Sequence, residues 1–273
     1  MRVERVKLHD NGSVARVDTA GLHYRELNSI LRSLVADGAD RIELRGVAGQ
    51  RYIGTDLDRP VQIDIFGVPG NDLGSFMDGP RVTVYGNAQD GCGNTMNHGT
   101  IIVHGLAGDI TGLSARGGKI FIRDDVGYRA GVHMKEFGDK CPKLVIGGTA
   151  QDFLGEYMAG GVLVVLGLTL GKRTRHLARF IGTGMHAGVI FLRGTVEEHQ
   201  LGKEVGVAQP DEGEERLLKE LVTEYCGYFE VEPESILDQP FIKLFPLYLR
   251  PYGPLYAPTH RGIQGLVSRW KVN

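Results

Sequence analysis

The side chains best suited to metal or acid–base chemistry in this chain recur at one position of a repeated unit. Asn71, Asp90, Asp109 and Asp152 occupy this position, and Tyr128 interrupts the series. Carboxylates at such spacing can bind calcium or act as acid and base. Asx side chains also accept hydrogen bonds from nearby backbone amides in turns. Because the series follows the repeat so faithfully, we favour the structural role.

The other potentially reactive residues do not form a recognisable site. His98, His104, His133 and His186 fall at different positions of the repeat, which does not predict a metal site. The three cysteines lie far apart without a CxxC spacing, so neither a disulfide framework nor a zinc or iron–sulfur site held by this chain alone is expected.

Three glycine-rich stretches resemble cofactor loops but depart from their patterns. GLTLGKRT (residues 167–174) has too few residues between its glycines for a phosphate loop, and Arg173 stands where Ser or Thr should follow the lysine. GCGNTMNHG (91–99) and GTGMHAG (182–188) do not open a helix, as a dinucleotide-binding loop must. We therefore expect no catalytic residue, no cofactor and no metal on this chain.

Composition limits the class of protein. The 273 residues include 31 basic and 33 acidic side chains, so the near-neutral charge gives no reason to expect binding to nucleic acid or to a membrane surface. The N-terminus lacks an apolar signal region, and the longest apolar run, VLVVLGLTL (162–170), is too short to span a bilayer. These features predict a cytoplasmic protein. Glycine is the exception to an ordinary composition, with 40 residues.

The elements that position these residues follow from an internal repeat, most of whose steps are 19 residues long. Each unit starts after a short run with apolar residues at alternate positions, as in Ile101 and Val103 or Ile120 and Ile122. Such alternation indicates a strand with one buried face. Units of this length cannot bury their apolar face alone, but stacked units can form one continuous core.

Two further positions of the unit are nearly invariant along the chain. Every methionine except the first residue lies at one of them, at Met77, Met96, Met134, Met158 and Met185, and Ala115 fills it in one unit. Glycine recurs three residues earlier, at Gly74, Gly93, Gly112, Gly131, Gly155 and Gly182. We expect the methionines to form a column inside the stack and the glycines to occupy bends.

These patterns predict a mainly β fold, a right-handed single-stranded parallel β-helix of about seven coils with helical caps. A β-propeller or a sandwich would need antiparallel hairpins, which the single strand per unit does not favour. We expect three segments: an N-terminal segment and capping helix (1–40), the β-helix (41–196), and a C-terminal helix followed by a Pro/aromatic-rich arm (197–273).

The flanking segments are expected to cover the ends of the stack. Apolar residues share one helical face in HYRELNSILRSLVA (23–36) and in EERLLKELVTEYCG (214–227), which we expect to cover the first and last coils respectively. The arm at 240–260 is apolar and rich in proline, so it packs either on the β-helix flank or on a partner.

Two insertions interrupt the repeat and, with the arm, supply possible partner contacts. EFGDKCP (136–142) and TLGKRTRH (169–176) are either solvated loops or binding loops. The possible partner contacts are Lys140, Lys172, Arg173, Arg175, Phe245, Tyr248 and Tyr252.

Several stretches resemble a known domain. LRGVAGQRYIG (44–54), GNAQDGCGNTM (86–96), GLAGDITG (105–112), GGTAQDFLGEYMAGGVLVVLG (147–167) and RFIGTGMHAGVIFLRG (179–194) resemble the GXGXG β-helix domain at the C-terminus of the glutamate synthase large subunit. The resemblance covers roughly residues 40–196. Relatives of that domain include the β-helical subunit of formylmethanofuran dehydrogenase and the small subunit of N-methylglutamate synthase, which the helix YRELNSIL also resembles.

The resemblance implies a non-catalytic scaffold subunit of a glutamate-synthase-type oxidoreductase. It would pack between an amidotransferase and a flavin-binding synthase component, with FMN and iron–sulfur clusters on those partners. The chain has none of the catalytic parts of the full enzyme, so no catalytic residue is carried over. The alternative is the equivalent scaffold subunit of a formylmethanofuran-dehydrogenase-type enzyme. A free-standing carbohydrate-active β-helix enzyme is a third interpretation.

Overall fold

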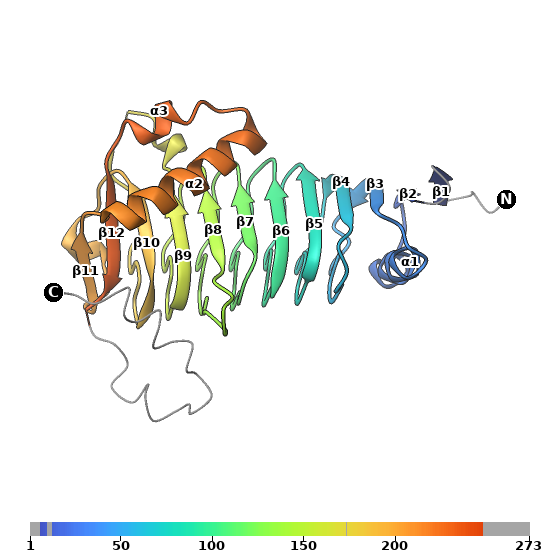
Figure 1. Ribbon diagram of the computed structural model, residues 1–273, viewed down its shortest axis with the longest axis horizontal. Helices are drawn as coiled ribbons and strands as arrows, with labels where there is room; N and C mark the ends of the chain where they lie inside the picture. The colour runs from blue at the N-terminus through green and yellow to red at the C-terminus, as the bar shows by residue number, and fades with distance from the viewer. Residues whose placement is uncertain (1–5, 10–12, 173, 248–273) are drawn as a thin grey trace, which may run out of the picture.

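Parallel strands stacked along one axis form the body of the molecule (Figure 1). The computed structural model describes residues 6–9, 13–172 and 174–247. The strands of the parallel series are β2 (Val14–Asp18), β3 (Arg41–Ala48), β4 (Gln62–Val68), β5 (Asp78–Tyr85), β6 (His98–Val103), β7 (Lys119–Ile122), β8 (Lys143–Ile146), β9 (Ala159–Val165) and β10 (Ala187–Arg193). Consecutive strands are neighbours throughout, so each coil adds one strand to the sheet. The predicted parallel β-solenoid is confirmed.

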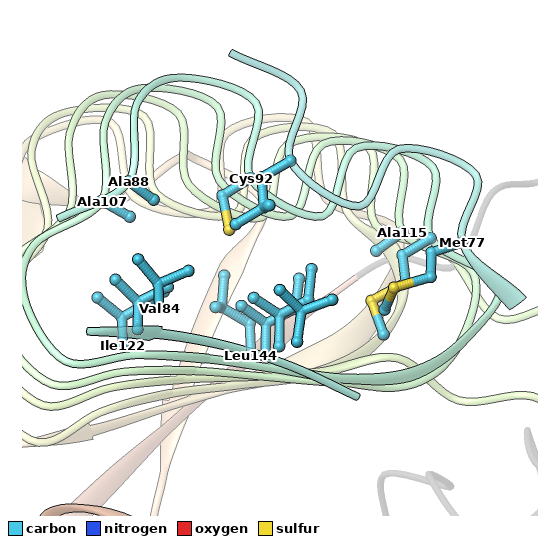
Figure 2. Close-up of a cluster of buried hydrophobic side chains, with 14 of the residues drawn as sticks. Met77, Val84, Ala88, Cys92, Ala107, Ala115, Ile122 and Leu144 are labelled. Carbon is cyan, nitrogen blue, oxygen red and sulfur yellow. The ribbon is translucent and has the colours of Figure 1, made fainter. Parts of the chain in front are cut away.

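The alternating apolar residues of the strands face the lumen. Val84 and Leu144 are fully buried, and Figure 2 shows both pointing from the sheet across the lumen, toward Ala88 and Cys92 on the opposite wall. Equivalent residues pair in register from strand to strand, so the lumen is lined by continuous apolar ladders. One of these ladders consists of Ala15, Ile42, Ile63, Val82, Ile101, Ile120, Leu144, Leu163 and Ile190.

The methionine position lines one edge of this lumen. Its side chains are all at most 2% exposed: Met77, Met96, Ala115, Met134, Met158 and Met185. Leu57 occupies the equivalent position in the first, longer unit. The backbone amide of Asp78 donates to the carbonyl of Leu57, just as the amide of Asn97 donates to the carbonyl of Met77. Flexible thioethers suit this narrow edge because they adapt to an irregular space.

The wall opposite the sheet is built from left-handed backbone instead of strand. In one coil, Asp72, Gly74 and Phe76 have φ values of 63°, 66° and 57°. The amides of Asp72 and Phe76 donate to carbonyls of the following coil, whereas the amide of Gly74 donates to Ile53 in the preceding coil. The same alternation recurs in later coils, so this wall satisfies its backbone polar groups through both neighbours.

Glycine is required at the middle of these three positions. It combines positive φ with an orientation toward the lumen, and a Cβ on Gly93 would lie 2.2 Å from Cδ1 of Ile120. The two flanking positions share the left-handed backbone but carry side chains that range from Asp72 to Phe76. The predicted glycines all have φ between 66° and 75°: Gly74, Gly93, Gly112, Gly131, Gly155 and Gly182.

Helix α1 (Tyr24–Ala36) covers the N-terminal end of the lumen, as predicted. Leu27, Leu31, Leu34 and Val35 are buried in the same core cluster as the strands. Because α1 connects β2 to β3, it replaces the turn wall of the first coil. Strand β2 and its antiparallel partner β1 (Val6–His9) lie in the N-terminal segment that precedes the predicted capping helix, where no strand was predicted.

The C-terminal end is covered by strands that come from distant parts of the chain. After β10 the chain forms β11 (Val205–Ala208), and β12 (Phe241–Pro246) then inserts between β10 and β11, antiparallel to both. Leu244 of β12 is fully buried in the core cluster of the lumen. The part of the arm that is described therefore packs on its own solenoid, and residues 248–260 of the arm lie outside the described residues.

Helix α2 (Glu212–Phe229) does not cover the last coil, so that prediction was wrong. It crosses the outer face of the sheet over β7 to β10 (Figure 1), and the short helix α3 (Glu234–Leu237) follows it. The reason lies in the ladder of outward-facing residues at the middle of each strand. This ladder is Arg16, Glu43, Asp64, Thr83, Ile102, Phe121, Val145, Val164 and Phe191.

The outward ladder changes from polar to apolar at Ile102, and its apolar part forms a second buried cluster with α2. Leu218, Leu221 and Val222 of the helix contribute to this cluster. The hydroxyl of Tyr225 donates to the carbonyl of Arg123 at 2.9 Å, and burial raises the pKa of Tyr225, so the donor stays protonated. Among the described residues, no helix combines the length and apolar character needed to cross a bilayer.

Replacing Gly93 with Ala is expected to destabilise the solenoid by about 3 kcal/mol, from left-handed strain together with the clash on Ile120. Gly138 is the matched control, since its φ is +63° but nothing lies within 4 Å of an added Cβ. Gly138→Ala should cost only about 1 kcal/mol. Urea denaturation measures both, and equal losses would show that lumen packing does not select this glycine.

Phe121→Ala should destabilise the protein by about 3 kcal/mol and loosen α2, because Phe121 is fully buried beneath the helix. Thr83→Ala changes the same ladder outside the apolar cluster and should cost less than about 1 kcal/mol. Limited proteolysis within residues 209–240 reports release of the helix. Unchanged cleavage in Phe121→Ala would contradict the role given to the outward ladder.

Candidate interaction surface

The Asx ladder binds backbone amides of neighbouring coils. Oδ1 of Asp90 accepts from the amide of Asp109 at 2.9 Å, and Oδ1 of Asp109 accepts from the amide of Tyr128 at 2.8 Å. Asp152 accepts from Arg179 in the same way at 2.8 Å. The structural role predicted for these carboxylates is confirmed, and the amide that each one binds belongs to the next coil.

The buried histidine and cysteine side chains have surroundings that keep them neutral. Burial lowers the pKa of His176, which is 2% exposed and lies 3.0 Å from the carbonyl of Arg193. Burial raises the pKa of both Cys92 and Cys141 to about 12, so neither thiol is a ready nucleophile. Within the described ranges, no three His, Cys, Asp or Glu side chains are grouped to hold a metal.

The structure separates the basic residues that the sequence placed in the two inserted loops. Lys140 lies 3.4 Å from the carboxylate of Asp78 and so makes a contact within the chain. Lys172 and Arg175 are exposed and line a depression of about 480 Å³ together with Thr174 and Leu177. Arg175 also forms an ion pair with Glu197, and Arg173 lies outside the described residues. Partner binding by these loops stays a prediction.

The aromatic residues of the arm divide in a similar way. Phe245 is half-buried on β12 and faces Gly206 of β11, where an added Cβ would lie 2.7 Å from its ring. It therefore holds the C-terminal strands together. Tyr248 and Tyr252 lie outside the described residues.

A cluster of aromatic and basic side chains on the turn wall was missed by the sequence analysis. We define the aromatic patch as Arg129, His133, Phe153, Tyr157 and Phe180, all of which occupy the outward left-handed positions beside the lumen residues. The rings of Phe153 and Phe180 stack at 4.9 Å, and those of His133 and Tyr157 stack at 5.4 Å. The repeat could have indicated this cluster, because each of its residues stands directly before a residue that faces the lumen.

The patch contains one buried charge. Glu156 lies between Phe153 and Tyr157 in sequence, and its side chain is only 9% exposed. Its partner is the guanidinium of Arg129, 3.3 Å away, which also lies 5.0 Å from the ring of Phe153. The arginine is 51% exposed, so the pair presents its positive group to solvent.

The aromatic residues of the patch occupy positions that the backbone does not favour. Left-handed φ costs a bulky residue about 1–2 kcal/mol relative to glycine. Tyr157 and Phe180 have φ values of 51° and 57°, yet they are 48% and 49% exposed, so burial offsets little of this cost. Earlier coils place Asp72 and Gly91 on the same ladder as Phe180, which shows that the coil does not need an aromatic ring there.

The sheet face outside α2 satisfies its own polar groups. Asp64 is fully buried there and accepts from Arg41 at 2.7 Å, and Glu43 pairs with Arg16 at 3.1 Å. The neighbouring rings of Phe66 and Tyr85 stack at 4.7 Å. Like the turn wall, this face buries its carboxylates beneath exposed arginines and carries an exposed ring, that of Tyr85.

Comparison with known proteins identifies the family. The model of the family described as GXGXG motif matches residues 42–247. The chain belongs to the GXGXG family. The matched region begins in β3 and runs beyond β12, so it includes α2 and the C-terminal strands as well as the coils.

Two known proteins are similar to this GXGXG chain, one in sequence and one in fold. "Uncharacterized protein MJ1350" of Methanocaldococcus jannaschii is 44% identical over 254 residues, covering 89% of this chain and 96% of the relative. A solved chain of the formyltransferase/hydrolase complex (FhcABCD) of Methylorubrum extorquens, in complex with methylofuran, has a similar fold. Its TM-score is 0.57 at 22% identity, over 81% of this chain and 87% of that chain. At this identity the likeness shows the fold.

Asp109→Ala should destabilise the protein by about 1 kcal/mol, because the amide of Tyr128 loses its acceptor. Asp109→Asn keeps an oxygen in place and should restore most of this loss. Neither EDTA nor added calcium should change the Tm of the wild type. A calcium-dependent rise in Tm that Asp109→Ala abolishes would assign the ladder to metal binding instead.

Proposed function

We propose that this chain is a structural subunit of a multi-subunit enzyme complex, in which the solenoid holds catalytic subunits in fixed positions. The observation that carries this proposal is the filled lumen, whose ladders of apolar side chains leave only the outer faces for binding. A stack tied by hydrogen bonds on two walls is a rigid body with a long surface, as binding solenoids are. The fold shared with a chain of FhcABCD supports membership in such an assembly.

We propose that the complex is of the formylmethanofuran dehydrogenase type and not a glutamate synthase. The fold comparison supports this choice, because FhcABCD is a formyltransferase/hydrolase complex solved with methylofuran. The role expected from the resemblance, between an amidotransferase and an FMN synthase subunit, is the second candidate. It rests on the sequence stretches from LRGVAGQRYIG to RFIGTGMHAGVIFLRG.

Purification of the natively expressed chain through an affinity tag tests the proposal. We expect stoichiometric partner subunits, identified by mass spectrometry, and recovery of the chain as a lone monomer would contradict a scaffold role. Formyl-transferring or formyl-hydrolysing partners, or a pterin-bound metal, would support the first complex. Flavin absorbance bands together with an amidotransferase subunit would select glutamate synthase.

A further inference from the structure

The aromatic patch has the features of a binding surface that the described part of the chain leaves uncovered. Tyr157 and Phe180 expose about half of their surface on the turn wall, whereas the other broad face of the same coils is covered by α2. Exposed aromatic residues gathered in one place mark interaction sites more often than scattered ones do. Aromatic residues and arginine are also the types enriched at the centres of protein interfaces.

The arrangement of the rings indicates what kind of molecule fits. Phe153 and Phe180 are nearly parallel, with 12° between their planes, and so are His133 and Tyr157. Stacking covers one face of each ring, and the guanidinium of Arg129 lies 5.0 Å from the ring of Phe153. Ring edges carry partial positive charge and suit carboxylates or the faces of other rings.

The charges of the surrounding side chains point in the same direction. The guanidinium of Arg129 faces solvent while its partner Glu156 is buried. Arg179 is exposed beside the patch, whereas Asp152 is partly buried and its Oδ1 accepts from the backbone amide of Arg179. The most exposed of these charged groups are thus the guanidinium groups of Arg129 and Arg179, which can pair with carboxylates of a partner.

We infer that the aromatic patch is the docking surface for a partner subunit, a polypeptide that presents apolar side chains flanked by Asp or Glu. This inference rests on the proposed scaffold function and adds the surface through which the scaffold binds. Phe153, Tyr157 and Phe180 are the apolar anchors. Arg129 orients the acidic flank of the partner.

The test uses the full-length tagged chain in its native complex, with asparagine in place of the aromatic residues. Asparagine tolerates left-handed backbone, so these variants keep the coil geometry. Phe76 is the matched control for Tyr157, because both lie on the same ladder of the turn wall and both are 48% exposed. Each chain is purified at equal expression, and partner subunits are quantified by mass spectrometry.

Tyr157→Asn and the double variant F153N/F180N should each lower partner recovery at least tenfold, since a central anchor contributes at least that factor to affinity. Phe76→Asn should leave recovery unchanged. Hydrogen exchange in the wild-type complex should show protection of residues 152–157 and 179–184 relative to the free chain. Thermal melts of the variants should match the wild type, which separates loss of docking from loss of folding.

The other outcomes overturn the inference in distinguishable ways. If wild type and patch variants retain partners equally, the docking surface lies elsewhere while the scaffold function stands. If the wild type purifies without partners, the scaffold function fails and the inference fails with it. If light scattering shows a homo-oligomer that dissociates in F153N/F180N, the occupant is a second copy of the chain.

Discussion

The hydrogen bonds between successive coils are the constraint on which the rest of this structure depends. On the sheet side they are ordinary parallel pairings, but on the turn wall they need left-handed backbone at alternate residues. Glycine at the inward position allows the two walls to approach closely enough for Met77 and Cys92 to fill the space between them. The motif that gives the family its name is therefore a requirement of backbone geometry and close packing.

A filled solenoid places all variable chemistry on its outside. The two broad faces have been used differently: α2 covers the apolar half of the sheet face, and ion pairs such as Asp64 with Arg41 satisfy the other half. Exposed rings and arginines occur on both faces, but among the described residues the rings that occupy left-handed backbone lie on the turn wall. The docking surface inferred above rests on this difference in backbone strain.

The role proposed for the chain follows from rigidity. Every coil is bonded to both neighbours, and the two ends of the lumen are covered by α1 and by β12. A body of this kind keeps surfaces several coils apart at fixed separation, as the proposed role requires.

The repeat in the amino-acid sequence was enough to define the strands, the inward ladders, the methionine column and the position of Gly93 and its equivalents. These features recur in every coil and depend on contacts with the adjacent copy, so the period alone reveals them. The three-dimensional structure was needed to show where α2 lies, how β12 closes the end, and which outward residues meet. Tyr225 and Arg123 are 102 residues apart, and their contact depends on which apolar surface remained uncovered once the stack had formed. Repetition fixes what lies inside a solenoid, whereas its outer contacts are made between segments that share no period.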